Sequence, residues 1–143
     1  MKKLLAFLCA LSMLFSLSAC DELLASPGIS DKAIIGVGDS VRFSDAEIRA
    51  AMDCVKQEFA GFRGCELKKL WYDEAASDQE ISYAAMLPDD TLPENVIVLM
   101  SELYAGKYGG ASGFEADSTC SNWAWTLTRE NNSAEWKVLD WGV

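Results

Sequence analysis

A helical pattern of apolar residues stands out in the first half of the chain. Ser44 and Glu47 have the spacing of a capping box, in which each side chain binds a free backbone N–H of the first turn. Apolar residues then recur at intervals of three and four, which predicts a helix over residues 45–60, ended by Gly61 in a left-handed conformation. The apolar stripe of this helix consists of Ile48, Ala51, Met52, Val55 and Phe59.

Later segments show the patterns of β-strands. Residues 65–74 predict a strand with a bulge near Lys68 and Lys69, because their apolar positions change face. Residues 96–100 are apolar on both faces, as in a central strand. Residues 123–128 alternate with a period of two, and residues 136–143 return as the second strand of a hairpin.

Two polar segments separate these strands. Residues 73–95 contain Pro88 and Pro93 and predict a long connection, with a further short strand around residues 81–86. Residues 106–121 are rich in glycine and predict a mobile loop, and no lysine-serine pair of a phosphate-binding loop follows these glycines. The pattern as a whole predicts an α+β domain with one N-terminal helix packed on a curved antiparallel sheet. This plan resembles the cystatin-like or nuclear-transport-factor-2-like cone.

The first 19 residues have the features of an export signal. Lys2 and Lys3 precede an apolar run over residues 4–17, and acidic residues follow at once. The run is shorter than the roughly 20 residues of a spanning helix, although an uncleaved anchor is the alternative. Its end, Leu17-Ser-Ala-Cys20, resembles the lipobox of bacterial lipoproteins.

The lipobox resemblance implies cleavage before Cys20 and attachment of acyl chains such as palmitate to that cysteine. The protein would then be held on the extracytoplasmic face of a cell membrane. Asp21 and Glu22 would resemble an inner-membrane retention signal in enteric bacteria only, so the choice of membrane stays open. Residues 20–40 predict a flexible tether, and residues 41–143 one folded domain.

The charge of the mature chain narrows the choice of partner. All 22 acidic residues follow Cys20 and two of the 12 basic residues precede it, so the mature net side-chain charge is −12. Such a charge argues against nucleic acid or anionic lipid as a direct partner of the domain. A small molecule or another envelope protein remains as the expected partner.

The chain contains no histidine, which excludes serine-histidine and cysteine-histidine nucleophile systems. Carboxylate acid-base chemistry remains, and its weak candidates are Asp140, or Asp73 with Tyr72. We expect Asp140 to share the Trp136–Val138 face of the last strand; a structural role, bonded to backbone or to Arg129, is the alternative. The acidic loops lack the spacing of a calcium loop, so no metal and no cofactor is expected.

The tryptophans and cysteines offer further candidates. Trp123, Trp125 and Trp136 would line a pocket between helix and sheet if its concave face is open, and would otherwise be core. Cys54 and Cys65 could form a disulfide outside the cytoplasm, whereas three free thiols including Cys120 are equally compatible with the spacing.

Several short motifs resemble those of a family of short lipoproteins from gut Clostridia and their relatives, a family with no assigned activity. The likeness covers residues 42–143, but Cys120 stands where an aromatic residue is expected. The motifs are Phe43-Ser-Asp-Ala-Glu-Ile48, Trp71-Tyr-Asp-Glu74, Asn122-Trp-Ala-Trp125 and Trp136-Lys-Val-Leu-Asp-Trp-Gly142.

Three functional hypotheses follow. The leading one is a membrane-anchored lipoprotein of the cell envelope whose domain binds a small molecule or a protein without catalysis. The second is an enzyme of the nuclear-transport-factor-2-like kind that uses carboxylates in a tryptophan-lined pocket. The third is a structural or inhibitory protein that acts through its acidic exterior.

Overall fold

The computed structural model describes residues 27–83, 87, 91–110 and 113–143. The export signal and Cys20 lie outside the described residues, as do residues 84–86 of the predicted short strand. In the described part, no helix is both long enough and apolar enough to cross a membrane. The elements are β1 (Gly28–Gly36), α2 (Asp45–Phe59), β2 (Cys65–Trp71), α3 (Glu74–Tyr83), the 3₁₀ turn η1 (Pro93–Asn95), β3 (Val96–Ala105), β4 (Ser118–Thr128) and β5 (Lys137–Gly142).

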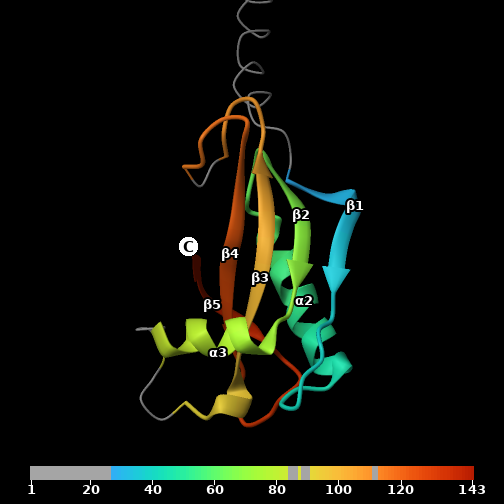
Figure 1. The fold of residues 1–143 in the computed structure, drawn as a ribbon, viewed down its shortest axis with the longest axis vertical. Helices are drawn as coiled ribbons and strands as arrows, with labels where there is room; N and C mark the ends of the chain where they lie inside the picture. Colours follow the sequence, from blue (N-terminus) through green and yellow to red (C-terminus); the bar gives the residue numbers. More distant parts are fainter. Residues whose placement is uncertain (1–26, 84–86, 88–90, 111–112) are drawn as a thin grey trace, which may run out of the picture.

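The strands form a five-stranded mixed sheet in the order β1-β2-β3-β4-β5 (Figure 1). β1 runs parallel to β2, and the other neighbours are antiparallel. The predicted α+β class, the central position of β3 and the β4–β5 hairpin are confirmed. The predicted bulge in β2 is also present, because the β2–β3 register shifts between Leu67 and Lys69.

Helix α2 forms as its sequence predicts. Ser44 and Glu47 make both hydrogen bonds of the capping box, and the five residues of the apolar stripe are all buried. The predicted stop is wrong in detail. Ala60 ends the helix in a right-handed conformation, and the left-handed residue is Gly64, with a φ of 81°, in the turn before β2. Glycine suits this position because, without a Cβ, it adopts a positive φ at little steric cost.

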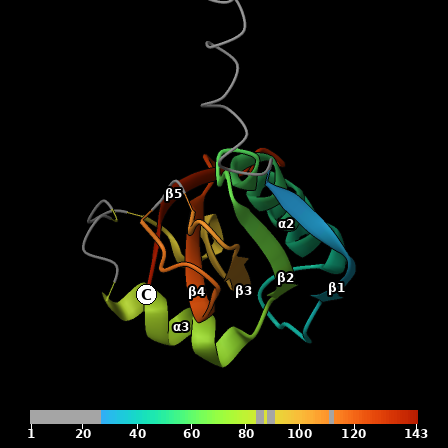
Figure 2. The same cartoon turned by 90° about the horizontal axis from the view of Figure 1, so that it is seen from above.

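Helix α3 corrects the prediction of a long connection with a short strand around residue 81. Asp73 caps its first turn by accepting a hydrogen bond from the Ala76 N–H at 2.7 Å. The buried Ser77 hydroxyl accepts the Val98 N–H at 3.1 Å, which fixes the helix to β3. Figure 2 shows α2 and α3 on opposite faces of the sheet.

Strand β1 corrects the tether prediction for residues 28–36, which pair with β2 at one edge of the sheet. Between Ile29 and Ile34 the strand advances five residues while β2 advances only from Leu67 to Lys69. This bulge divides β1 into two short paired stretches. β4 likewise begins at Ser118, inside the predicted loop.

Candidate functional site

The tryptophans that were candidates for lining a pocket fill the interior. Trp125 is fully buried, and Trp123 and Trp136 are 8% and 6% exposed. They pack among the apolar stripe of α2 and the inner residues of β2 and β3. Of the two alternatives for these three rings, the core role fits the structure, because they present almost no surface to a ligand.

Hydrogen bonds and ring contacts hold this aromatic core together. The Trp125 indole N–H donates to the Ser101 hydroxyl at 2.8 Å, and that hydroxyl donates to the Trp123 carbonyl oxygen at 3.2 Å. Trp123 stacks on Trp141 with ring centroids 5.5 Å apart, and Phe62 contacts both rings. Of these rings, only Trp141 is substantially exposed, at 40%.

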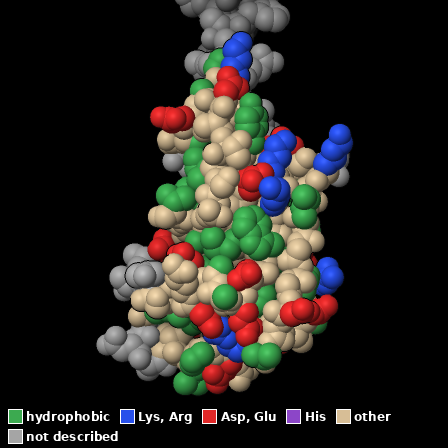
Figure 3. Space-filling view, viewed as in Figure 1, with side chains coloured by type: hydrophobic (Ala, Val, Ile, Leu, Met, Phe, Trp, Pro, Cys, Tyr) green, Lys and Arg blue, Asp and Glu red, His purple; other side chains and the backbone are tan. Residues whose placement is uncertain are grey.

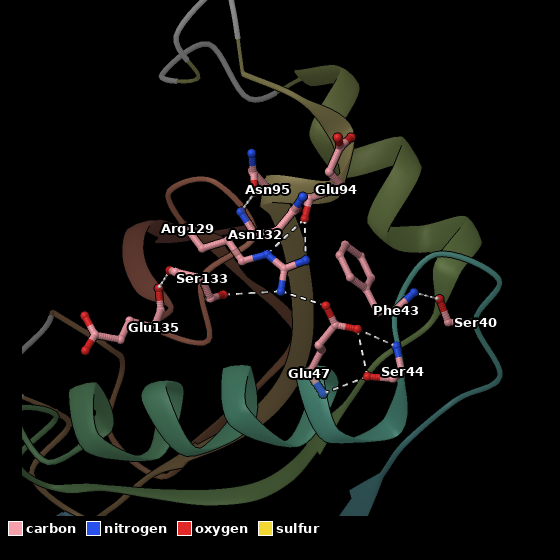
Figure 4. Close-up of polar contacts among 10 residues, drawn as sticks. All are labelled: Ser40, Phe43, Ser44, Glu47, Glu94, Asn95, Arg129, Asn132, Ser133 and Glu135. Atoms are coloured by element: carbon pink, nitrogen blue, oxygen red, sulfur yellow. Dashed lines mark hydrogen bonds and ion pairs between the residues drawn. The ribbon is translucent and has the colours of Figure 1, made fainter.

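An ion pair between the buried Arg129 and the half-buried Glu47 fixes the end of the domain where α2 begins (Figure 4). Arg129 Nη1 donates to Glu47 Oε1 at 2.7 Å, and its Nε and Nη2 donate to the Glu94 carbonyl oxygen at 3.1 and 2.8 Å. The guanidinium carbon also lies 4.5 Å from the Trp136 ring centroid. The Arg129 side chain is only 4% exposed, so this cluster joins α2, η1 and the hairpin rather than binding a ligand.

The surroundings of Glu47 strongly favour its charged form. Its Oε2 accepts the Ser44 N–H at 2.8 Å and the Ser44 hydroxyl at 2.7 Å. These two hydrogen bonds, followed by the one from Arg129, lower the pKa of Glu47 to about 2 from its ordinary value of 4.5. Arg129 thus pairs with Glu47. The alternative in which Arg129 bonds Asp140 is not formed.

Asp140 lies on the other face of the sheet from the one expected. The β4–β5 register passes from Leu127↔Val138 to Thr126↔Asp140, so Leu139 is an extra residue on β5. The bulge turns Asp140 toward the face that carries α3, whereas Val138 packs against the core. The expectation that Asp140 shares the Trp136–Val138 face is therefore wrong.

Asp140 instead lies in a groove of about 220 Å³ between the end of α3 and the last strand. Glu80 of α3 lies in the same groove, so two carboxylates from distant parts of the sequence line one depression. Asp140 is exposed and Glu80 is half-buried. We name this depression the acidic groove; its lining residues are Glu80, Ala124, Thr126, Asp140, Trp141, Gly142 and Val143.

Tyr72 and Asp73, the other catalytic candidates, have structural positions. Tyr72 is buried, and its hydroxyl donates to Glu74 Oε2 at 3.3 Å. Burial raises the pKa of Tyr72. Asp73 is the cap of α3, and neither residue lines the acidic groove. The structure therefore does not bring Tyr72 and Asp73 together with Asp140.

The three described cysteines are free thiols, so the Cys54–Cys65 disulfide is not formed. The Cys54 thiol donates to the Trp136 carbonyl oxygen at 3.2 Å. Burial raises the pKa of all three thiols, which disfavours the reactive thiolate. Across the described ranges, no three His, Cys, Asp or Glu side chains are grouped to hold a metal ion.

Sequence reasoning identified Asp140 but missed its neighbours in the groove. Glu80 lies within residues 73–95, whose pattern predicts a connection and not a helix, so the sequence does not bring it near Asp140. The face of Thr126 could be predicted, because it lies between Trp125 and Leu127 on the strand and successive side chains point to opposite faces. Comparisons with known protein families, curated proteins and solved structures found no match to this chain.

Proposed function

We propose that this protein is a lipoprotein of the cell envelope, anchored by acyl chains on Cys20 at the extracytoplasmic face of a membrane. We further propose that its domain is a non-catalytic binding module whose acidic groove receives a cationic group of a small molecule or of another envelope protein. The lipobox-like Leu17–Cys20 segment supports the anchor. The groove itself is the observation that carries the binding proposal.

The chemistry of the groove suits cation binding. Two carboxylates, Glu80 and Asp140, face a depression that is open to solvent. A cation about 4 Å from a carboxylate near a protein surface gains roughly 1–4 kcal/mol. Trp141 also borders the groove, but its ring stacks on Trp123 on the other face of the sheet, so the attraction rests on the two carboxylates. An amine or guanidinium group therefore fits better than a neutral or anionic ligand.

Binding accounts for the groove better than catalysis does. A carboxylate that transfers protons near neutral pH needs an environment that holds it in position and shifts its pKa. Within the described structure, Asp140 has no hydrogen-bond or ion-pair partner to position it, and it is exposed. An electrostatic contact with a cation needs only the negative charge, which both side chains supply.

The fold resemblance also becomes a proposal at this point. We propose a distant relation to the cystatin-like or nuclear-transport-factor-2-like cone. A single helix that precedes the antiparallel strands, and a final hairpin, support it. The parallel strand β1 and helix α3 would be additions to that plan.

Calorimetric titration of residues 21–143 with spermidine and with a lysine-containing peptide tests the binding proposal. We expect saturable binding that weakens about tenfold or more in the double variant Glu80→Gln/Asp140→Asn. The matched control is Asp39→Asn/Glu58→Gln, which removes the same charge from exposed positions outside the groove. Equal losses in both double variants would show that net charge, and not the groove, attracts the cation.

Mass spectrometry of the mature chain tests the anchor. We expect an N-terminal Cys20 that carries diacylglyceryl and acyl groups, and no acyl groups on the Cys20→Ala variant. A full-length chain that keeps residues 1–19 would refute the anchor proposal.

A further inference from the structure

The N-terminus of the described domain lies at a defined end of the sheet. Gly28 pairs with Glu66, and the neighbouring Cys65 pairs with Ala105, which in turn pairs with Ser118. The β3–β4 turn and the turn before β2 therefore extend from the same end as the first residue of β1. Figure 1 shows this arrangement, with the start of β1 and the β3–β4 turn toward the top.

The chain length between Cys20 and β1 limits how far this end can lie from a membrane. Seven residues separate Cys20 from Gly28. A fully extended chain gains at most about 3.6 Å per residue, so Gly28 lies no more than roughly 29 Å from a lipidated Cys20. The ten residues of β3 alone span a similar length, roughly 33 Å. Such a short connection keeps this end of the domain nearest to the bilayer.

The side chains at this end suit a headgroup layer. Tyr108 is 60% exposed, so it contributes little to the core. The ammonium group of Lys107 lies 5.5 Å from the Tyr108 ring centroid. Arg63, just before β2 at this end, and Lys32, four residues beyond Gly28 in the β1 bulge, are also exposed. Tyrosine, lysine and arginine are the residue types that settle at membrane–water interfaces, with apolar stems or rings inward and polar ends in water.

Acidic residues are more numerous toward the opposite end, although Glu66, Glu115 and Asp117 lie at the end that carries Tyr108. Many of the acidic residues lie around α3, η1 and the β4–β5 turn, and Figure 3 shows acidic side chains concentrated over the lower half of that face. An anionic lipid surface therefore repels that end more strongly than the other. The net charge of the mature chain therefore weighs more strongly against contact at the acidic end than at the end that carries Tyr108. The acidic residues toward this opposite end include Asp45, Asp73, Glu74, Asp78, Glu80, Glu94, Glu130 and Glu135.

We propose that Lys32, Arg63, Lys107 and Tyr108 form a membrane-contact surface that the short tether holds against lipid headgroups. This inference rests on the proposed lipidation of Cys20. The contact orients the domain, so that the half of the sheet with Arg129, α3 and the acidic groove extends away from the bilayer. The groove is then open to partners in the envelope rather than turned toward lipid.

Photocrosslinking in vesicles tests the orientation. Tyr108 is replaced by p-benzoylphenylalanine in the full chain, which is processed in bacteria, purified and placed in vesicles of phosphatidylcholine and phosphatidylglycerol at 7:3. The matched control carries the same group in place of Leu92, which is 55% exposed at the opposite end. We expect lipid adducts at position 108 to exceed those at position 92 at least fivefold.

Each outcome bears on one of the two proposals. Acylated protein with equal adduct yields at the two positions overturns the contact surface and leaves the anchor standing, whereas an unmodified Cys20 in the same sample overturns both. A second substitution, Lys107→Glu, probes the charge of the surface. We expect it to lower the adduct yield at position 108 at least twofold in these vesicles, and an unchanged yield would remove Lys107 from the contact.

Discussion

Replacement of Glu47 by glutamine removes the charge that faces the buried Arg129. Glutamine at this position can still accept the Ser44 N–H, so the capping box is kept while Arg129 loses its counter-charge. The Arg129 side chain is 4% exposed and stays buried, which makes the loss costly. We therefore expect a less stable but folded protein.

The magnitude follows from the pKa of Glu47. A pKa lowered from 4.5 to about 2 corresponds to about 3 kcal/mol of stabilisation by the charged form. The Glu47 side chain is 35% exposed, so solvent screening reduces the contribution to about 1–2 kcal/mol. For a domain of about 100 residues, this predicts a fall in Tm of roughly 4–16 °C.

The same pKa sets the pH dependence. Because the folded-state pKa of Glu47 lies below the unfolded value, its contribution is complete above about pH 5 and is lost as the pH falls toward 2. The stability difference between the wild type and Glu47→Gln should therefore shrink on acidification. Urea unfolding followed by tryptophan fluorescence at pH 7 and pH 3 measures it, with the exposed Glu58→Gln as control. A difference that is absent at pH 7, or equal at both pH values, would refute the reasoning.

Two further predictions concern the packing of the domain. Gly38→Ala should lower the free energy of unfolding by about 1–3 kcal/mol, because the added Cβ would overlap the Tyr72 carbonyl oxygen. Gly142→Ala is the control and should cost less than about 1 kcal/mol, because a Cβ there meets nothing within 4 Å. Equal losses in urea unfolding would contradict this packing. In a thiol titration of native protein with a disulfide reagent, the half-buried Cys54 and Cys120 should react before the buried Cys65, and earlier reaction of Cys65 would mean that the β2 end of the core opens.

Local signals explain which elements could be predicted. Helix α2 has its cap and its apolar stripe within 16 consecutive residues, so its position needs no information from elsewhere. Helix α3 lacks such a stripe, and its buried Ser77 accepts a hydrogen bond from the distant Val98 N–H. β1 is held by parallel pairing with a strand some 35 residues away. Those two elements depend on contacts that the local pattern does not encode.

The candidate site shows the same limit. The alternation in β4 correctly separates Trp123 and Trp125 from Thr126, but it does not tell whether space remains beside the tryptophans. Phe62 and Trp141 fill that space in the structure. Asp140 could be identified as a candidate from the sequence. The face of the sheet on which it lies depends on a one-residue bulge at Leu139, and no residue type there indicates a bulge.

The bulge in β1 bears on how neighbouring copies behave on a shared membrane. Proteins anchored in one lipid layer meet at high local concentration, where a straight, apolar edge strand invites intermolecular sheet formation. The exposed Ile29, Ile34 and Ile35 make this edge apolar. The interrupted register leaves only two short segments in regular geometry, 28–29 and 34–36, and each is too short to nucleate a stable intermolecular ladder. The irregular edge thus works against aggregation of the protein in a crowded envelope.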